Sequence, residues 1–197
     1  PGTLIRMHQH RNEEIISWVP AGVMRHDDRE GNQLVTDSEH LMIMGAGSGF
    51  WHSEETLADD PPLRMLQIFV RPHSLDLEPG IQHEPIPEST PNEWRYLFGP
   101  EDGDAPLSVR NDVQFYDCWV DEGATVSLPS RSGWDTYLYV FEGEVTTDDG
   151  ETTIGYTESA LITGETGRLV TATEDSILVA FRIDPDAPIT RQGTIGR

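Results

Sequence analysis

Residues 2–14 read GTLIRMHQHRNEE, with histidines at positions 8 and 10. On a β-strand, side chains at i and i+2 point to one face about 7 Å apart, so His8 and His10 can share one ion. The same spacing returns 42 residues after His10 as His52-Ser-Glu54. If both strands belong to one barrel, the sequence predicts that three imidazoles and one carboxylate converge inside it.

The face that carries these side chains is predicted to be the interior one. Phe50 is in phase with His52, whereas Met7 alternates with His8 and would point outward. Polar groups inside a barrel are unfavourable unless something pairs with them. A transition metal would do so, since three histidines and a carboxylate suit Fe(II), Mn, Ni, Cu or Zn and leave positions open for water or substrate.

The rest of the chain is predicted to form short strands. Runs of β-branched and aromatic residues recur about every ten residues, separated by Gly, Pro, Asp and Asn. Two series of such runs predict an all-β protein with two small barrels or sandwiches in tandem. The predicted strands cover residues 3–10, 14–19, 22–27, 33–36, 40–44, 49–54 and 64–70, then 107–109, 113–120, 125–128, 136–141, 144–147, 152–154, 159–162, 168–172 and 177–182.

Seven prolines lie between residues 72 and 106, where the strand pattern stops. Proline donates no backbone hydrogen bond, so a stretch rich in it is typical of a connection with little regular structure. We therefore expect an N-terminal metal-binding barrel over residues 1–78, a linker over 79–106, a second barrel over 107–184 and an irregular tail over 185–197.

The composition is strongly acidic. Asp and Glu number 35 against 13 basic residues, all of them arginine, for a net charge of −22. Nucleic acids and anionic membranes would repel such a surface, which excludes direct binding to either. No apolar run is long enough to span a bilayer and no signal-like segment opens the chain, which predicts a cytoplasmic location. The absence of lysine fits adaptation to concentrated salt or a GC-rich genome equally well.

Several further residues have roles that the sequence suggests. Ile16 and Trp18 are expected either to line a substrate pocket together with Phe50 or to pack in the core. Gln67 lies between apolar neighbours and could hydrogen-bond to a ligand or to a metal-bound water; an amide that stands behind a metal ligand or faces solvent is an equal alternative. Cys118 is expected to be a buried, inert thiol. The remaining histidines are expected at the surface: His26, His40, His73 and His83.

The spacing Gly2-x5-His8-x-His10-x3-Glu14, followed by Gly22, resembles the first cupin motif. Together with Gly31-Asn32 and the run GAGSGFWHSE over residues 45–54, it is similar to the pirin family in particular. The resemblance covers most of residues 1–72, and residues 107–183 more weakly. Pirins are bicupins, so the resemblance implies two cupin-type barrels in tandem.

Pirins bind a metal, usually iron, in their N-terminal barrel through three histidines and one glutamate. The resemblance therefore implies one divalent ion, Fe(II) before Cu, Ni, Mn or Zn, held by His8, His10, His52 and Glu54. In many other cupins the glutamate of the first motif is a ligand, which makes Glu14 the alternative. Family members usually have several tens of residues before the first histidine pair, so the first barrel is expected to be incomplete at its N-terminus.

The second barrel is expected to lack a metal. When Gly123 is aligned with the start of the cupin motif, Pro129 and Arg131 stand where histidines would be needed. A barrel without imidazole ligands cannot bind an ion in this way. We expect it to be a scaffold or an interface module.

Two functions follow from the resemblance, with a metal-free or vestigial sugar-type cupin as a third, weaker possibility, and whether the chain is an enzyme is left open. One is an oxidoreductase of the quercetin 2,3-dioxygenase type acting on a flavonol or enediol-like molecule, with Glu54 or Glu14 accepting the substrate's proton. The other is a non-catalytic, metal-dependent regulator, a pirin-type cofactor or redox sensor that acts through protein partners. The expected partners are thus a small molecule or a protein, with a homodimer as a further option.

Overall fold

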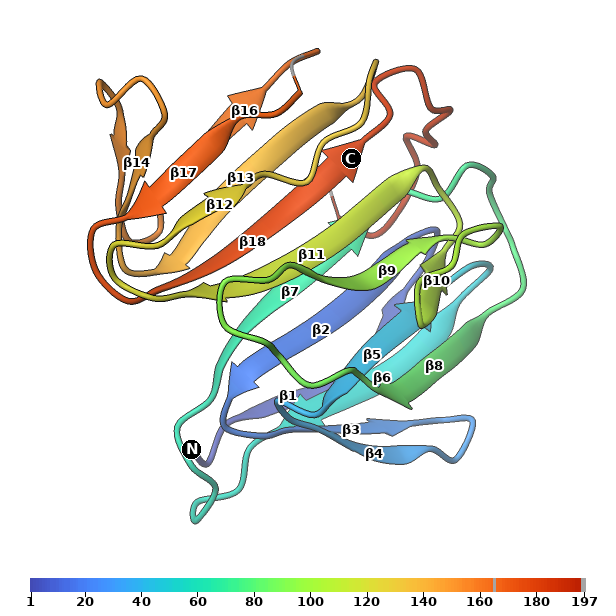
Figure 1. Cartoon of the computed structure of the whole chain (residues 1–197). Coiled ribbons are helices and arrows are strands. Elements are labelled where there is room, and N and C mark those ends of the chain that lie inside the picture. Colours follow the sequence, from blue (N-terminus) through green and yellow to red (C-terminus); the bar gives the residue numbers. More distant parts are fainter. Residues whose placement is uncertain (165, 196–197) are drawn as a thin grey trace. The chain divides into compact units, whose positions relative to one another are not determined.

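The computed structural model describes residues 1–164 and 166–195, and these residues form strands but no helix (Figure 1). Accordingly, this part of the chain contains no helix long and apolar enough to cross a membrane. It falls into two compact units. Residues 1–86, 106–111 and the described part of 188–197 form the first, and residues 87–105 and the described part of 112–187 form the second. The all-β prediction is confirmed.

The first unit is built from two four-stranded antiparallel sheets. Their strand orders are β1-β6-β3-β4 and β7-β2-β5-β8, so β1 and β7 are both edge strands. The bounds are β1 Leu4–His10, β2 Glu14–Ala21, β3 Met24–Asp28, β4 Gln33–Thr36, β5 His40–Gly45, β6 Phe50–Glu55, β7 Arg64–Val70 and β8 Gly80–Pro85, with the short β10, Leu107–Val109, in the same unit.

Alternation along β2 sets the core of this unit. Ile15 packs with Met44 and Phe50, and Val19 packs with Met24, all of them buried. Each fully buried side chain of this size stabilises the fold by about 1.5–3 kcal/mol. The interior face of β2 is therefore the one that carries its odd-numbered residues.

The second unit also contains two sheets. The larger has the order β9-β11-β18-β13-β16 and the smaller β12-β17-β14-β15. Cys118, Leu138 and Leu178 are fully buried in its core, so the thiol is inaccessible as predicted. The bounds are β9 Arg95–Pro100, β11 Val113–Val120, β12 Thr125–Ser127, β13 Asp135–Glu142, β14 Val145–Thr147, β15 Thr153–Ile154, β16 Ser159–Ile162, β17 Leu169–Ala172 and β18 Ser176–Ile183.

The stretch expected to be an irregular linker, residues 79–106, differs from the expectation. It contains β8, which pairs with β5, and β9, which pairs with β11. The prolines that suggested irregular structure stand at the strand ends: Pro79 precedes β8, and Pro85 and Pro100 close β8 and β9. A proline at a strand end or on an edge strand costs no ladder hydrogen bond, which is why the strands tolerate them.

Residues 188–195 form no strand and lie against the first unit. The Thr190 hydroxyl donates to the Pro72 carbonyl oxygen at 3.1 Å, and the Arg11 backbone N–H donates to Thr194 Oγ1 at 2.8 Å. The tail predicted over 185–197 begins three residues before this segment, its last two residues lie outside the described part, and its bounds stay a prediction. The N-terminal incompleteness of the first barrel stays a prediction.

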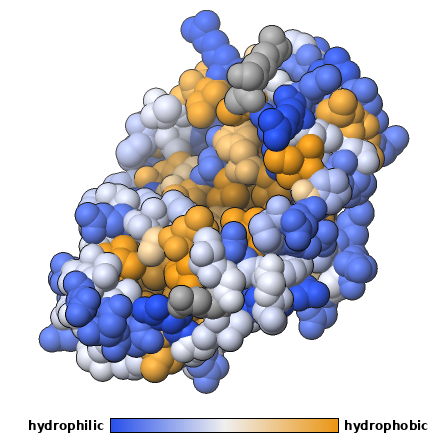
Figure 2. Space-filling model, turned by 90° about the horizontal axis from the view of Figure 1, so that it is seen from above, coloured by the Kyte–Doolittle hydropathy of each residue, from blue (hydrophilic) through white to orange (hydrophobic). Residues whose placement is uncertain are grey.

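The surface carries apolar side chains despite the charge of −22. On the face shown in Figure 2, hydrophobic residues reach the surface in several patches among hydrophilic ones. Leu4 in the first unit and Leu161 in the second are each 59% exposed. Scattered exposure of this kind is ordinary for a folded protein.

Candidate metal centre

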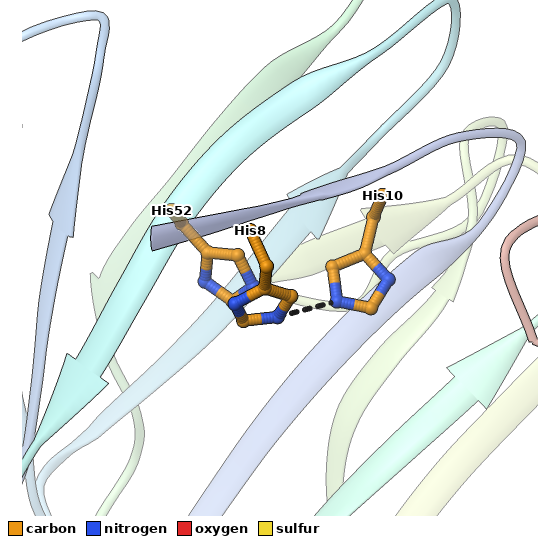
Figure 3. Close-up of side chains that lie close together, drawn as sticks. All are labelled: His8, His10 and His52. Carbon is orange, nitrogen blue, oxygen red and sulfur yellow. Dashed lines mark hydrogen bonds between the residues drawn. The ribbon is translucent and has the colours of Figure 1, made fainter. Parts of the chain in front are cut away.

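Three histidines come together in the first unit, with their rings close to one another (Figure 3). His8 and His10 lie on β1 and His52 on β6, and one ring nitrogen of each is within 4.8 Å of the others. The ring centroids of His8 and His52 are 4.5 Å apart. His10 and His52 are buried, whereas Met7, which precedes His8 and alternates with it, is 38% exposed. The predicted strand phase is therefore correct.

A β-bulge sets the direction of the β1 side chains. His8 is paired with His52 and Ile5 with Glu54, so β1 uses three steps where β6 uses two. The extra residue shifts the alternation by one, which puts Ile5 and His8 on the same face although their numbers differ by three. Without the bulge, either Ile5 or the histidines would point away from β6's interior face.

The Nδ1 atoms of the two β1 histidines are held by other groups. His8 Nδ1 donates to the Arg6 carbonyl oxygen at 2.9 Å, and His10 Nδ1 donates to Glu13 Oε2 at 2.8 Å. A neutral imidazole with its proton on Nδ1 has a lone pair on Nε2. If both rings are neutral, the two Nε2 atoms, 3.0 Å apart, face each other as lone pairs, and a cation beside both would remove the repulsion; if one ring carries a second proton, its Nε2–H donates to the other ring, the bond drawn in Figure 3.

His52 completes a donor set that fits a metal ion. Its Nε2 is buried and has no hydrogen-bond partner in the described part of the chain. Burial, followed by the nearby His8, His26 and His10, lowers the pKa of His52 to about 3, so the ring stays neutral and keeps a lone pair. Two nitrogens bound at right angles about 2.1 Å from one ion are about 3.0 Å apart, which matches the distance between the His8 and His10 nitrogens.

His26 contacts the Nδ1 side of the His52 ring. Its predicted position at the surface is wrong. Its side chain is fully buried, and its Nδ1 lies 3.4 Å from His52 Nδ1. Asp28 Oδ2 accepts from His26 Nε2 at 3.0 Å, so His26 Nδ1 is left to accept the proton of His52 Nδ1. The signal was present in the sequence, because His26-x-Asp28 has the same i, i+2 spacing as the first histidine pair. His73 is exposed, and His40 and His83 are half-buried.

Glu54 lies close to His52 but outside the group of three ring nitrogens. Its Oε1 is 3.8 Å from His52 Nδ1, and both of its carboxylate oxygens accept from Gln67 Nε2, at 2.9 and 3.2 Å. Burial raises the pKa of Glu54, and the Gln67 hydrogen bonds partly oppose this. Gln67 on β7 therefore hydrogen-bonds to Glu54, the predicted fourth ligand.

The structure does not bring Glu14 to the histidines. Its carboxylate accepts from Arg110 Nε at 2.8 Å and forms an ion pair with the same guanidinium. Glu14 lies on the β2 face opposite Ile15, so strand alternation turns it away from the interior. A second buried carboxylate at the site is Glu13, which accepts from His10 Nδ1 and also from the Ile195 backbone N–H. Sequence reasoning missed Glu13, since no spacing distinguishes it from its neighbour.

Ile16 and Trp18 do not line the space around the histidines. Both are buried, but they share the face of β2 opposite Ile15 and Val19, which pack in the interior. The core alternative for these two residues is therefore the correct one. Phe50 is buried in the interior cluster and lies on the same face of β6 as His52, in agreement with the predicted phase.

A small apolar cavity reaches Glu54. It has a volume of about 290 Å³ and is lined mainly by Ile5, Met24, Leu63 and Met65. The ring of Phe69 on β7 lies close to that of His10, with centroids 6.0 Å apart, and Phe69 is 39% exposed. A concave, largely apolar site with two carboxylates, here Glu54 and Glu55, is typical of small-molecule binding.

Comparison with known families gives two matches. The family described as Pirin matches residues 2–70, and the family described as quercetinase C-terminal cupin domain matches residues 96–183. The crystal structure of the bacterial pirin YhhW of Escherichia coli in complex with nickel(II) has a TM-score of 0.81 at 22% identity, over 93% of this chain and 78% of that one. This likeness confirms the fold of two cupin domains in tandem.

Curated relatives carry related names. A candidate quercetin 2,3-dioxygenase of Mycobacterium tuberculosis is 30% identical over 146 residues, which are 73% of this chain and 59% of that protein. The Escherichia coli protein named quercetin 2,3-dioxygenase is 26% identical over 182 residues, 90% of this chain and 75% of that one. The match with the first of these relatives thus spans about 59% of its length.

Proposed function

Since the chain belongs to the pirin family of bicupins, we propose that its first unit holds one divalent transition metal and uses it to oxygenate a small molecule. The observation that carries the proposal is the buried Nε2 of His52, which has no partner within the described residues and lies in a group with His8 and His10. Leaving a buried ring nitrogen unpaired costs about 1–3 kcal/mol, and a metal ion would remove that cost.

In this proposal His8, His10 and His52 bind the ion through Nε2, and Glu54 is the fourth ligand. Such an ion supplies Lewis acidity toward an enolic or phenolic hydroxyl and a position for dioxygen. Fe(II) is the first choice, with Cu, Ni, Mn and Zn as alternatives for this donor set. The nickel(II) complex of the Escherichia coli pirin supports a divalent ion in general.

The chain's own residues would orient the substrate and take its proton. The cavity formed by Ile5, Met24 and Met65 would receive an apolar ring and exclude water from the carboxylate. Glu54, held by two hydrogen bonds from Gln67, would accept the proton of the substrate's hydroxyl. A flavonol or another enediol-like molecule has the acidic hydroxyl and flat ring that this arrangement requires.

Elemental analysis of protein purified without chelators tests the metal. We expect about one equivalent of a transition metal, lost in His52→Ala and retained in His73→Ala, which changes an exposed histidine to the same residue. Equal metal content in the two variants would contradict the proposed site, and so would a wild-type protein that takes up no transition metal.

An aerobic assay with quercetin tests the reaction. The metal-loaded protein should remove the flavonol absorbance and release CO, and Glu54→Gln should slow this by about 100-fold or more. If no metal form turns over any flavonol or enediol while the metal is bound, the second function, a metal-dependent regulator with a protein partner, is favoured instead. The cytoplasmic location and the homodimer stay predictions.

A further inference from the structure

The second unit has its own polar cluster at one end of its interior. Gln114 and Tyr116 lie on β11 in phase with the core residue Cys118, so they share its face. Arg182 on β18 is paired with Gln114, and Tyr96 on β9 is paired with Tyr116. We name these four side chains, Gln114, Tyr116, Arg182 and Tyr96, the mouth cluster.

The cation of the mouth cluster has only neutral partners. Arg182 Nε donates to Gln114 Oε1 at 2.6 Å, and a second N–H of the same guanidinium also reaches that oxygen. Arg182 Nη1 donates to the Ser130 carbonyl oxygen at 3.1 Å, and the guanidinium lies 5.2 Å from the Tyr116 ring centroid. Within the described residues Arg182 forms no ion pair, and two of its five N–H donors stay free.

Comparable arginines of this chain are paired with carboxylates. Arg25, Arg95 and Arg110, whose side chains are 30%, 10% and 17% exposed, form ion pairs of 2.7, 2.7 and 2.5 Å with Asp60, Asp117 and Glu14. A half-buried charge is unfavourable without a counter-charge. The protein has 35 acidic residues, yet no described carboxylate contacts this half-buried guanidinium, and Asp104 acts on the two tyrosines through charge alone. We infer that the missing counter-charge is an anion from outside the chain.

The tyrosines of the cluster add an aromatic surface and a free hydroxyl. Tyr96 and Tyr116 are stacked, with ring centroids 4.8 Å apart and planes at 16°. Tyr96 accepts from Gln114 Nε2 at 2.9 Å, whereas the Tyr116 hydroxyl has no hydrogen-bond partner among the described residues. Both rings are half-buried, so solvent reaches them. A second cation, Arg131, lies in the loop before β13, 4.3 Å over the ring of Trp134.

We propose that the mouth cluster is a binding site for a small aryl carboxylate. The carboxylate would take the free N–H groups of Arg182 and the hydroxyl of Tyr116, and the aryl ring would pack against the stacked tyrosines. All the residues involved belong to the second unit, so this site is separate from the candidate metal centre and does not depend on the proposed oxygenase function.

Calorimetric titration of the metal-free protein with 4-hydroxybenzoate tests the site. We expect saturable binding at millimolar or lower concentration, and at least about tenfold weaker binding of the neutral analogue 4-hydroxybenzamide. Arg182→Met should weaken 4-hydroxybenzoate binding by about tenfold or more, and Tyr116→Phe by a smaller factor. Arg6→Met, which removes the same charge from an exposed position in the first unit, is the matched control and should bind like the wild type.

A His8→Ala/His52→Ala double variant separates this site from the metal centre, because it should bind 4-hydroxybenzoate unchanged. Should Arg182→Met fail to fold, as judged by its thermal transition, Arg182→Lys and Tyr116→Phe carry the test. The proposal is overturned by an absence of saturable binding, by equal binding of acid and amide, by an equal loss in Arg6→Met, or by a loss confined to the histidine variant.

Discussion

The three candidate histidine ligands are each held in one tautomer by a different kind of group. A carbonyl oxygen holds His8, the carboxylate of Glu13 holds His10, and His26 backed by Asp28 holds His52. Groups behind a ligand fix its orientation and raise its basicity. The groups that hold the Nδ1 atoms therefore matter to metal binding as the ligands themselves do.

Replacing His26 tests this support directly. His26→Phe keeps an aromatic ring in the buried position but removes both nitrogens, so His52 loses the group that accepts its Nδ1 proton. We expect metal affinity, measured by competition with a chelator, to fall by about 10- to 100-fold. His40→Phe is the control, because it makes the same exchange at a histidine that stacks on His83 and does not belong to the metal centre, and it should leave the affinity unchanged. Equal affinities in the two variants would show that His26 has no role in metal binding.

The thiol of Cys118 offers a second test at this scale. Burial raises its pKa to about 12, with smaller contributions from Asp117 and Glu93, and the side chain is fully inaccessible. Thiol reagents need an exposed thiolate. Native protein should therefore not react with an aromatic disulfide reagent at mildly alkaline pH. Protein in denaturant should react, releasing one equivalent of the reagent's thiolate per chain. Rapid labelling of the native state would contradict the burial.

At the scale of elements, the turns and bulges decide which side chains face the interior. The bulge in β1 puts His8 and His10 on the same face of the sheet as His52 of β6. The turn between β2 and β3 leads into β3, which pairs with β6 on its other side and carries His26. The turn between β2 and β3 contains Gly22, whose φ is +82°. A Cβ on Gly22 would lie 2.5 Å from the Pro62 carbonyl oxygen, so backbone would have to move.

Two glycine variants separate conformational strain from steric clash. Gly31 in the β3–β4 turn also has a positive φ, +96°, but a Cβ there would meet nothing within 4 Å. We expect Gly31→Ala to cost about 1 kcal/mol of unfolding free energy and Gly22→Ala about 3 kcal/mol, as measured by urea unfolding. If the two variants lose the same stability, the contact with residues 62–63 is not a constraint on the turn.

At the scale of the whole molecule, the charge of −22 is the dominant property. Like charges on one compact chain repel, and this repulsion lowers the stability of the folded state. Salt shortens the range of the repulsion, from about 10 Å at 0.1 M to about 3 Å at 1 M. The lysine-free composition makes salt dependence the most direct global test.

We expect the thermal midpoint to rise by several degrees when NaCl is increased from about 0.1 to about 1 M. The same salt step near the isoelectric point of about 4.4, where the net charge is small, is the control and should have a much smaller effect. A midpoint that does not change with salt at neutral pH would leave the GC-rich genome as the explanation of the missing lysines.

Local pattern was sufficient to predict much of this protein. Period-two alternation predicted most of the strands, the interior phase of His8, His10, His52 and Phe50, and the tandem all-β plan, because alternation is a property of each strand alone. Prolines misled the prediction at β8 and β9, because their effect depends on whether a strand lies at an edge or continues past them.

Pairing between distant segments settled the rest. Glu13 and Glu14 are adjacent in the chain, yet one holds His10 and the other pairs with Arg110, since β2 begins between them and turns Glu14 to the opposite face. His26 is buried because β3 lies beside β6, and Arg182 is without a carboxylate because of its neighbours on β11. Period and spacing are encoded locally, whereas the partner of a buried polar group depends on which strands come to lie side by side.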